Sequence, residues 1–395
     1  MILKHMKTLF CMTILTALLA VHASAAPDLE IMNVPAAADA GIIAIASDEH
    51  VASIIIDPQD FPVVHLAAGF FADDVERMSG HRPLVGEAPV GDNPVIIVGT
   101  IGHSAIIDRL ARQGKLPELD KIKGHWETTL WAVVENPMPN VARALVIGGS
   151  DRRGTAYGLM QLSERIGVSP WYWWADVPAQ HRDSLAVRIA SPQVDSPGVK
   201  YRGIFINDED WGLNPWAKLT FDPEFKNIGP KTYEKVFELM LRLRLNYIWP
   251  AMHACSTEFG SMPENVALAD KYGIVAGASH CEPMLCNNVK WDVNAKGPWD
   301  YSKNRDVIRS YWEDMVKARG DDEAVWTLGI RGIHDAPMNG PKDIPARVKL
   351  VTEVIHDQRL YRNHEAGEDH EPQQPPAGEV QLGDGVTASG GDRQR

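Results

Sequence analysis

The residues of this sequence best suited to chemistry follow a short apolar run near its centre. Residues 201–206 favour a β-strand and end in the polar segment 207–210, which carries three carboxylates. A buried strand that ends in carboxylates beside flat aromatic rings is typical of a sugar-cleaving site at the mouth of a barrel. The alternative is an acidic surface loop that caps the next helix. The candidates are Asp208 and Asp210 as catalytic residues, and Glu209 and Trp211 as substrate-binding residues.

Polar residues follow three later apolar runs in the same way. The runs are residues 245–249, 274–279 and 324–330, which we predict to be strands. Glycoside hydrolysis by two carboxylates needs a proton donor and a base or nucleophile, and an arginine can hold a substrate carboxylate through two hydrogen bonds. The residues are Trp249 and His253 after the first of these runs, His280 and Glu282 after the second, and Arg331, His334 and Asp335 after the third, with Asp335 as a further candidate catalytic carboxylate.

Each of these residues also has a structural explanation when it is taken alone. His253 could be a satisfied polar residue of a loop, Asp335 could cap a turn, and Glu282 could brace its neighbours. The repetition after successive strands favours a site. Right-handed βα crossovers place the carboxyl ends of parallel strands on one face, so we expect these side chains to converge.

The elements that would position them form an α/β fold. Residues 200–359 alternate predicted strands with helices, which is the pattern of the first half of a (β/α)8 TIM-type barrel. Before it, residues 27–195 indicate a small N-terminal α/β domain, and residues 191–199, with two prolines, read as the linker. The aromatic cluster 171–174 is expected at the domain junction or beside the site. Predicted helices are 61–80, 106–113, 156–166, 231–244, 263–272, 305–317 and 344–357.

Composition and the N-terminus bound the possible partners. The chain has 395 residues and a net charge of -13, which argues against nucleic acid and anionic membrane surfaces. Residues 1–25 combine a basic start, an apolar run at 9–20 and the small-residue pattern Ala23-Ser24-Ala25, so we predict a signal peptide cleaved after about Ala25. The protein is therefore expected in the periplasm or secreted.

Cysteine usage gives no complete disulfide framework. Removal of the signal peptide leaves Cys255, Cys281 and Cys286, an odd number. Cys281 and Cys286 could bridge or bind a metal, but no second ligand pair stands at suitable spacing, so we expect no metal site.

Residues 360–395 differ from the rest of the chain. They are rich in Glu, Gln, Gly, Pro and Asp and cannot bury a core, so we expect a disordered, aberrant tail. Four strands do not close a barrel, which favours a truncated or frame-shifted form of a longer protein. An inactive fragment or a carbohydrate-binding remnant is thus the alternative to an enzyme.

At its motifs the sequence resembles glycoside hydrolase family 115, the xylan α-1,2-glucuronidases. The resemblance rests on FINDEDWGLNPWA, NYIWPAMH, ENVALADKYGIVAGASHCEPM and TLGIRGIHDAPM, and covers about residue 30 to Arg359. It implies an inverting glycosidase that removes glucuronic acid or its 4-O-methyl ether from xylan or glucuronoxylan oligosaccharides without a cofactor. It also implies an N-terminal α/β domain, a (β/α)8 catalytic barrel and a homodimer in the full-length form.

The resemblance assigns roles residue by residue. Asp210 or Asp208 acts at the reacting centre, and Asp335 is a catalytic carboxylate or its close partner. The uronic acid is oriented by His280 and Glu282 and receives positive charge from Arg331 and His334. Two departures stand out: Cys281 replaces a histidine that the family usually has, and the family's barrel continues well beyond Arg359. A hexosaminidase-like hydrolase is a second alternative, but it predicts an adjacent Asp-Glu pair that residues 334–336 lack.

Overall fold

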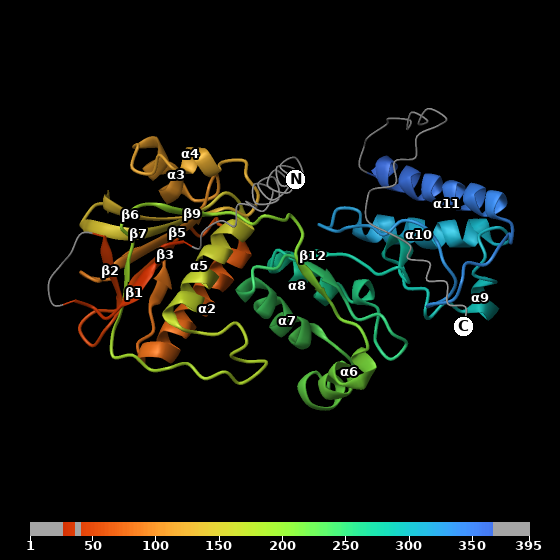
Figure 1. Ribbon diagram of the computed structural model, residues 1–395, viewed down its shortest axis with the longest axis horizontal. Coiled ribbons are helices and arrows are strands. Elements are labelled where there is room, and N and C mark those ends of the chain that lie inside the picture. Colours follow the sequence, from red (N-terminus) through yellow and green to blue (C-terminus); the bar gives the residue numbers. More distant parts are fainter. Residues whose placement is uncertain (1–26, 36–40, 366–395) are drawn as a thin grey trace, which may run out of the picture.

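The computed structural model describes residues 27–35 and 41–365. The predicted signal peptide and residues 366–395 of the predicted tail lie outside the described residues. Figure 1 shows two parts arranged along the long axis, an N-terminal part that holds most of the strands and a second part coloured green to blue. The α/β fold class expected from the sequence is confirmed.

A six-stranded sheet with the order β4-β3-β5-β7-β6-β9 forms the N-terminal part. Its first four strands in that order are parallel, whereas β6 and β9 run antiparallel to their neighbours. All six residues of β5 are buried, as expected for a strand covered on both faces. The elements are β3 Ser53–Ile56, α2 Pro62–Ser79, β4 Leu84–Gly86, β5 Val95–Thr100, α3 Ala105–Arg112, α4 Leu119–Ile122, β6 Thr129–Met138, β7 Val141–Gly149, α5 Arg152–Ile166 and β9 Gln193–Asp195.

Alternate side chains of this sheet enter two separate cores. Ile96 and Val98 pack in the core that α2 and α5 share with the second part, whereas Val95 and Ile97 pack in the core beneath α3 and α4. The period of two along the strand thus determines which layer each residue contacts. A small antiparallel sheet, β1-β8-β2, completes this part, with β1 Glu30–Met32, β2 Ile42–Ala46 and β8 Leu185–Arg188.

Part of the linker expected at residues 191–199 belongs to the six-stranded sheet instead, which corrects the prediction. Its residues Gln193–Asp195 form β9, which pairs antiparallel with β6 at Thr129–Trp131. Proline is tolerated at the beginning of an edge strand, where its missing N–H costs no ladder hydrogen bond, so Pro192 does not prevent pairing.

The second part contains three short parallel strands in the order β10-β11-β12. They are followed by helices close to the expected positions. The fourth expected strand is wrong: of residues 324–330, only Ala324 makes a β-bridge, to Ala276 of β12. The elements are β10 Gly203–Phe205, α7 Pro230–Arg242, β11 Tyr247–Trp249, α8 Pro263–Lys271, β12 Val275–Ala276, α10 Arg305–Arg319 and α11 Ile344–Glu365.

Helix α11 also corrects the boundary of the expected tail, because residues 360–365 are helical. Tyr361 packs with the core of α10 and α11. Short elements lie in the loops: η1 Glu209–Trp211, α6 Leu213–Trp216, the π-helix η2 Ala217–Phe221, η3 Phe259–Ser261, η4 Pro283–Leu285 and α9 Val293–Lys296. No helix among the described residues is long and apolar enough to cross a bilayer.

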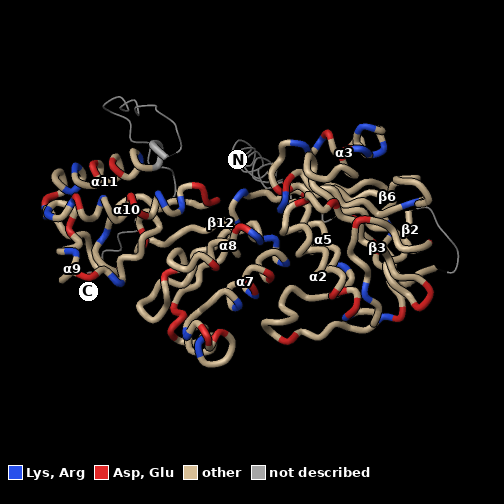
Figure 2. Tube along the Cα trace, turned by 180° about the vertical axis from the view of Figure 1, so that it is seen from behind, with Lys and Arg blue, Asp and Glu red and all other residues tan. Residues whose placement is uncertain are grey.

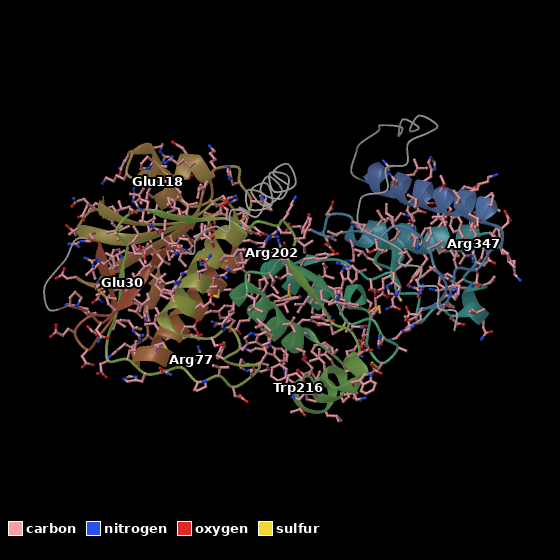
Figure 3. All side chains as sticks on the ribbon, viewed as in Figure 1. Glu30, Arg77, Glu118, Arg202, Trp216 and Arg347 are labelled. Atoms are coloured by element: carbon pink, nitrogen blue, oxygen red, sulfur yellow. The ribbon has the colours of Figure 1, made fainter. Side chains whose placement is uncertain are left out.

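The two parts meet where α7 packs against α5, with α2 beside it (Figure 1). The aromatic cluster 171–174 lies at this junction, as one of its two expected positions: Tyr172 donates a hydrogen bond to Glu238 over 2.7 Å, and Trp174 donates to the Lys235 carbonyl over 3.1 Å. On the other side of the junction, Arg202, labelled in Figure 3, pairs over 2.6 Å with Glu127, which is buried. Polar and apolar contacts thus join the parts.

Candidate active site

The loops that follow β10, β11 and β12 come together with the loop 331–335. Because the three strands are parallel and adjacent, their carboxyl ends share one edge of the sheet. The convergence expected from the sequence is therefore present, and it can be followed as a chain of contacts from Asp210 to His280.

The first arm of this chain joins the loops after β10 and β11. Asp210 Oδ1 lies 3.1 Å from His253 Nδ1. Glu209, which is 2% exposed, accepts a hydrogen bond from the His253 backbone N–H over 2.7 Å. Its other oxygen, Oε2, is buried without a hydrogen-bond partner, 3.9 Å from His253 Nδ1. Glu209 thus fixes the backbone of His253, while Asp210 orients its ring.

The second arm is centred on Asp335. Its Oδ1 lies 2.9 Å from His280 Nε2 and 3.4 Å from an Arg331 guanidinium nitrogen, and its Oδ2 lies 3.2 Å from His334 Nδ1. The hydrogen bond from His280, together with His334 and Arg331, lowers the pKa of Asp335. A carboxylate surrounded in this way stays ionised at neutral pH and can act as a base or an anion partner.

The two arms meet through their histidines. The rings of His253 and His334 have centroids 5.6 Å apart. The candidate catalytic residues Asp210 and Asp335, each paired with one of these histidines, therefore belong to one site. His334 has a left-handed backbone, with φ of 54°, which turns the chain between Ile333 and Asp335.

Glu282 takes no part in this series of contacts from Asp210 to His280. Its side chain is 6% exposed, and Oε1 accepts a hydrogen bond from the Asn287 amide over 3.0 Å. Burial raises the pKa of Glu282 to about 8, against the Asn287 hydrogen bond and with the help of the nearby Glu258 and Glu209 charges. Burial raises the pKa of Glu258 as well. The sequence predicted that Glu282 orients the uronic acid. This role stays a prediction, and the structure shows that the Glu282 side chain is buried.

The remaining candidates are Asp208, Trp211 and Trp249. Asp208 is exposed, with a left-handed φ of 57°, and Trp211 is 86% exposed. Trp249 donates a hydrogen bond from its indole to the Tyr247 hydroxyl over 2.6 Å and packs edge-on against Phe205. These rings lie on the face of the sheet opposite Ile204 and Ile248, which pack into the core. Phe205 and Trp249 therefore lie on the face of the sheet that does not pack into this core.

Two groups of residues in the site have ligand atoms close enough to hold a metal ion. They are Asp208, Asp210 and His253, and His280, Cys281 and Asp335, with ligand atoms within 4.8 Å in each group. The guanidinium of Arg331 beside Asp335 opposes a cation at the second group. Cys281 and Cys286, the pair considered for a bridge or a metal, are free buried thiols.

Sequence reasoning missed Asn287 and Asn288, which connect the loops of the site. Their sequence signal was weak, an Asn-Asn dipeptide a few residues after the third strand. Asparagine is common in loops, so the dipeptide alone does not distinguish a buried bridge from a solvated turn.

Parallel strands that end in paired carboxylates and histidines, beside exposed aromatic rings, define a site of the glycoside-hydrolase class. Comparison with known proteins gives the family. The model of Glycosyl hydrolase family 115 matches residues 194–375. The solved structure described as "A novel family GH115 4-O-Methyl-alpha-glucuronidase, BtGH115A, with specificity for decorated arabinogalactans" is 38% identical, with a TM-score of 0.72. The part of the chain that these matches cover belongs to glycosyl hydrolase family 115.

That match covers 82% of this chain and 41% of BtGH115A, so the chain spans less than half the length of this relative. Two further structures are alike only distantly, with 9% identity each. "Structure of CpGH84D" has a TM-score of 0.41 and coverage of 86% and 48%, and the Streptomyces plicatus N-acetyl-beta-hexosaminidase has 0.44 with 84% and 62%. They carry no information about function, and the hexosaminidase-like alternative gains no support from them. No curated protein sequence matches the chain.

Proposed function

We propose that this chain carries the site of an inverting glycosidase that removes glucuronic acid or 4-O-methylglucuronic acid side groups from xylan. The observation that carries the proposal is the contact chain from Asp210 through His253, His334 and Asp335 to His280. The family membership supports it, since BtGH115A is described as a 4-O-methyl-α-glucuronidase.

In this proposal Asp335 is the base. His280, His334 and Arg331 keep its carboxylate ionised, which is the charge state that activates a water molecule. Asp210 and His253 form the proton donor for the leaving oxygen. Asp210 Oδ1 and His253 Nδ1 are 3.1 Å apart, which is close enough to share a hydrogen-bonded proton. An inverting reaction requires about 6.5–9.5 Å between the two carboxyl groups, to leave room for water.

The uronate carboxylate of the substrate binds at the positive side of the same site. Arg331 carries a permanent charge, and His280 and His334 add donors beside it. Trp211 is exposed and offers a flat face on which a pyranose of the main chain can stack. Binding of an anion at one end and a neutral sugar ring at the other gives the site its polarity.

Hydrolysis by the full chain tests the proposal. The chain is incubated with 4-O-methylglucuronoxylan oligosaccharides, and released uronic acid is followed by chromatography, while proton NMR identifies the first anomer formed. We expect release of the uronic acid as the β-anomer from its α-linkage. Release of the α-anomer would exclude inversion, and no release would favour an inactive fragment or a carbohydrate-binding remnant.

Glucuronic acid on arabinogalactan is a second candidate substrate. The description of BtGH115A as specific for decorated arabinogalactans favours it. The same assay with an arabinogalactan oligosaccharide that carries a terminal glucuronic acid separates the two substrates through the ratio of kcat/KM.

We further propose that the protein is exported to the periplasm or beyond. The support is the sequence pattern of residues 1–25, with Lys4 and Lys7 before an apolar run and Ala23-Ser24-Ala25 after it. Mass spectrometry of the protein from its native cells is expected to show a mature N-terminus near Ala26. A retained Met1 would contradict export.

A further inference from the structure

Two consecutive asparagines, Asn287 and Asn288, connect three loops of the site. They lie between η4 and α9, and their exposed fractions are 5% and 0%. Neither takes part in the chain of carboxylates and histidines. Buried amide groups are stable only where their donors and acceptors find partners, so their contacts show what they hold together.

Asn287 holds the loop that carries His253. Its Nδ2 donates to the carbonyl of Met252, the residue before His253, over 2.9 Å, and to Glu282 over 3.0 Å. Its backbone N–H donates to Glu258 Oε1 over 3.0 Å. A single residue thus ties the loop after β11 to the buried Glu282 in the loop after β12.

Asn288 holds the loop that carries His334. Its Oδ1 accepts a hydrogen bond from the His334 N–H over 3.1 Å, and its Nδ2 donates to the Gly332 carbonyl over 3.1 Å. Its backbone N–H donates to the carbonyl of Cys281, beside His280, over 3.2 Å. The left-handed φ of 54° at His334 is unfavourable for a residue with a side chain, and the hydrogen bond at its own N–H stabilises that conformation.

We propose that Asn287 and Asn288 are positioning residues that set the spacing between His253 and His334, and hence between the carboxylates paired with them. The two asparagines are adjacent in the chain, so their Cα atoms stay about 3.8 Å apart. A shift of either histidine loop must therefore move the other loop or break a buried hydrogen bond. The kinetic consequences rest on the proposed glycosidase function, whereas the structural consequence rests on the contacts alone.

The test compares three variants of the full chain. Asn288→Leu removes both side-chain hydrogen bonds at similar size, and Asn288→Asp keeps an oxygen that can accept from the His334 N–H. The matched control is Asn265→Leu, because Asn265 is also fully buried but its amide contacts Met262 within its own helix region. The readouts are the nuclear Overhauser effect between the His253 and His334 rings in histidine-labelled protein, and kcat and KM on a glucuronoxylan oligosaccharide.

We expect Asn288→Leu to lose the effect between the rings and to lower kcat at least tenfold, with KM changed by less than threefold. Asn288→Asp should give an intermediate loss, and Asn265→Leu should change neither readout. A folded Asn288→Leu protein with the ring effect and kcat intact overturns the proposal. If that variant does not fold, wild-type behaviour of Asn288→Asp in both readouts overturns it instead.

The two proposals fail in different ways. If the wild-type chain releases no uronic acid, the glycosidase proposal fails for this chain. The ring effect in the same set of variants still decides whether the asparagines position the histidines.

Discussion

Two charge networks in this molecule use the same kinds of side chain in opposite environments. At the junction of the two parts, Arg242 pairs with Asp74 over 2.6 Å and with Glu238 over 3.0 Å, and all three are buried. In the site, Asp335 contacts His280 and Arg331, and its side chain is 66% exposed. Figure 2 shows that acidic and basic residues are otherwise dispersed over both parts.

Burial separates the charges that stabilise the fold from the charges that remain accessible to a ligand. Burial raises the pKa of Asp74, although Arg242 and Arg77 oppose the shift. The junction network therefore carries a desolvation cost that only complete pairing offsets. The exposed carboxylate of Asp335 has little such cost, contributes little to stability and leaves the cations around it accessible to a substrate anion. Breaking each network should accordingly affect a different property.

The largest effect is expected on stability, from Arg242→Met. This change leaves Asp74 and Glu238 buried without their shared cation, so the free energy of unfolding should fall by about 3–5 kcal/mol. Urea denaturation measures it. The matched change at an exposed pair, Arg82→Met beside Asp73, should cost less than about 1 kcal/mol. Equal losses at both sites would contradict the distinction between the networks.

Asp335→Asn should give the largest catalytic effect. Loss of the ionised base lowers kcat by about 10²–10³-fold, whereas the unfolding midpoint should change little because Asp335 is exposed. Steady-state kinetics with a glucuronoxylan oligosaccharide measures it. Asp321→Asn is the control, since Asp321 is an exposed acidic residue after α10. A kcat within threefold of the wild type would remove Asp335 from the catalytic role.

Glu282 allows a test that depends on pH. Its pKa in the folded protein is about 8, above the ordinary 4.5, so the folded state binds more protons than the unfolded state between these values. The free energy of unfolding should therefore fall as pH rises through this window, by up to about 1.4 kcal/mol per pH unit from this group. Glu282→Gln should reduce that slope in urea titrations from pH 5 to 8. An unchanged slope would show that Glu282 ionises freely.

The smallest effect is expected from a change at Trp211. Trp211→Ala removes an exposed ring that does not pack in the core, so KM for an oligosaccharide should rise several-fold, by about 1 kcal/mol of binding free energy, at unchanged kcat. A substrate that lacks the main-chain xylose residues provides the control. The KM for that substrate should be the same for the variant and the wild type. A fall in kcat would place Trp211 inside the reacting centre.

The strongly periodic elements could be predicted from the sequence. So could the edge of the sheet, at the carboxyl ends of the strands, where the polar residues meet. Helix α2 and strand β5 follow directly from their apolar patterns, and the convergence of the loops that carry Asp210, His253 and His280 follows from the handedness of βα units. The fourth strand failed for a tertiary reason. The backbone N–H and carbonyl of Gly329 bond to the side chain of Gln358, not to a neighbouring strand.

The roles of the buried polar residues could not be obtained from the sequence. Glu282 and His280 both follow the same predicted strand, and only the packing shows that Glu282 is buried and His280 is exposed. The asparagine pair gave no periodic signal, since its function depends on backbone atoms of Met252 and Gly332 that lie far from it in the chain. Local patterns thus locate a site, and long-range hydrogen bonds decide its geometry.

Calorimetric titration of the chain with 4-O-methylglucuronic acid tests most directly whether the exposed network serves a uronate. It needs no turnover, and it compares the wild type with Arg331→Met and with the surface control Arg112→Met. We expect binding to the wild type and to Arg112→Met, with at least a tenfold weaker association for Arg331→Met. No heat of binding to the wild type, or equal affinity in all three proteins, would contradict a uronate site at Asp335 and Arg331.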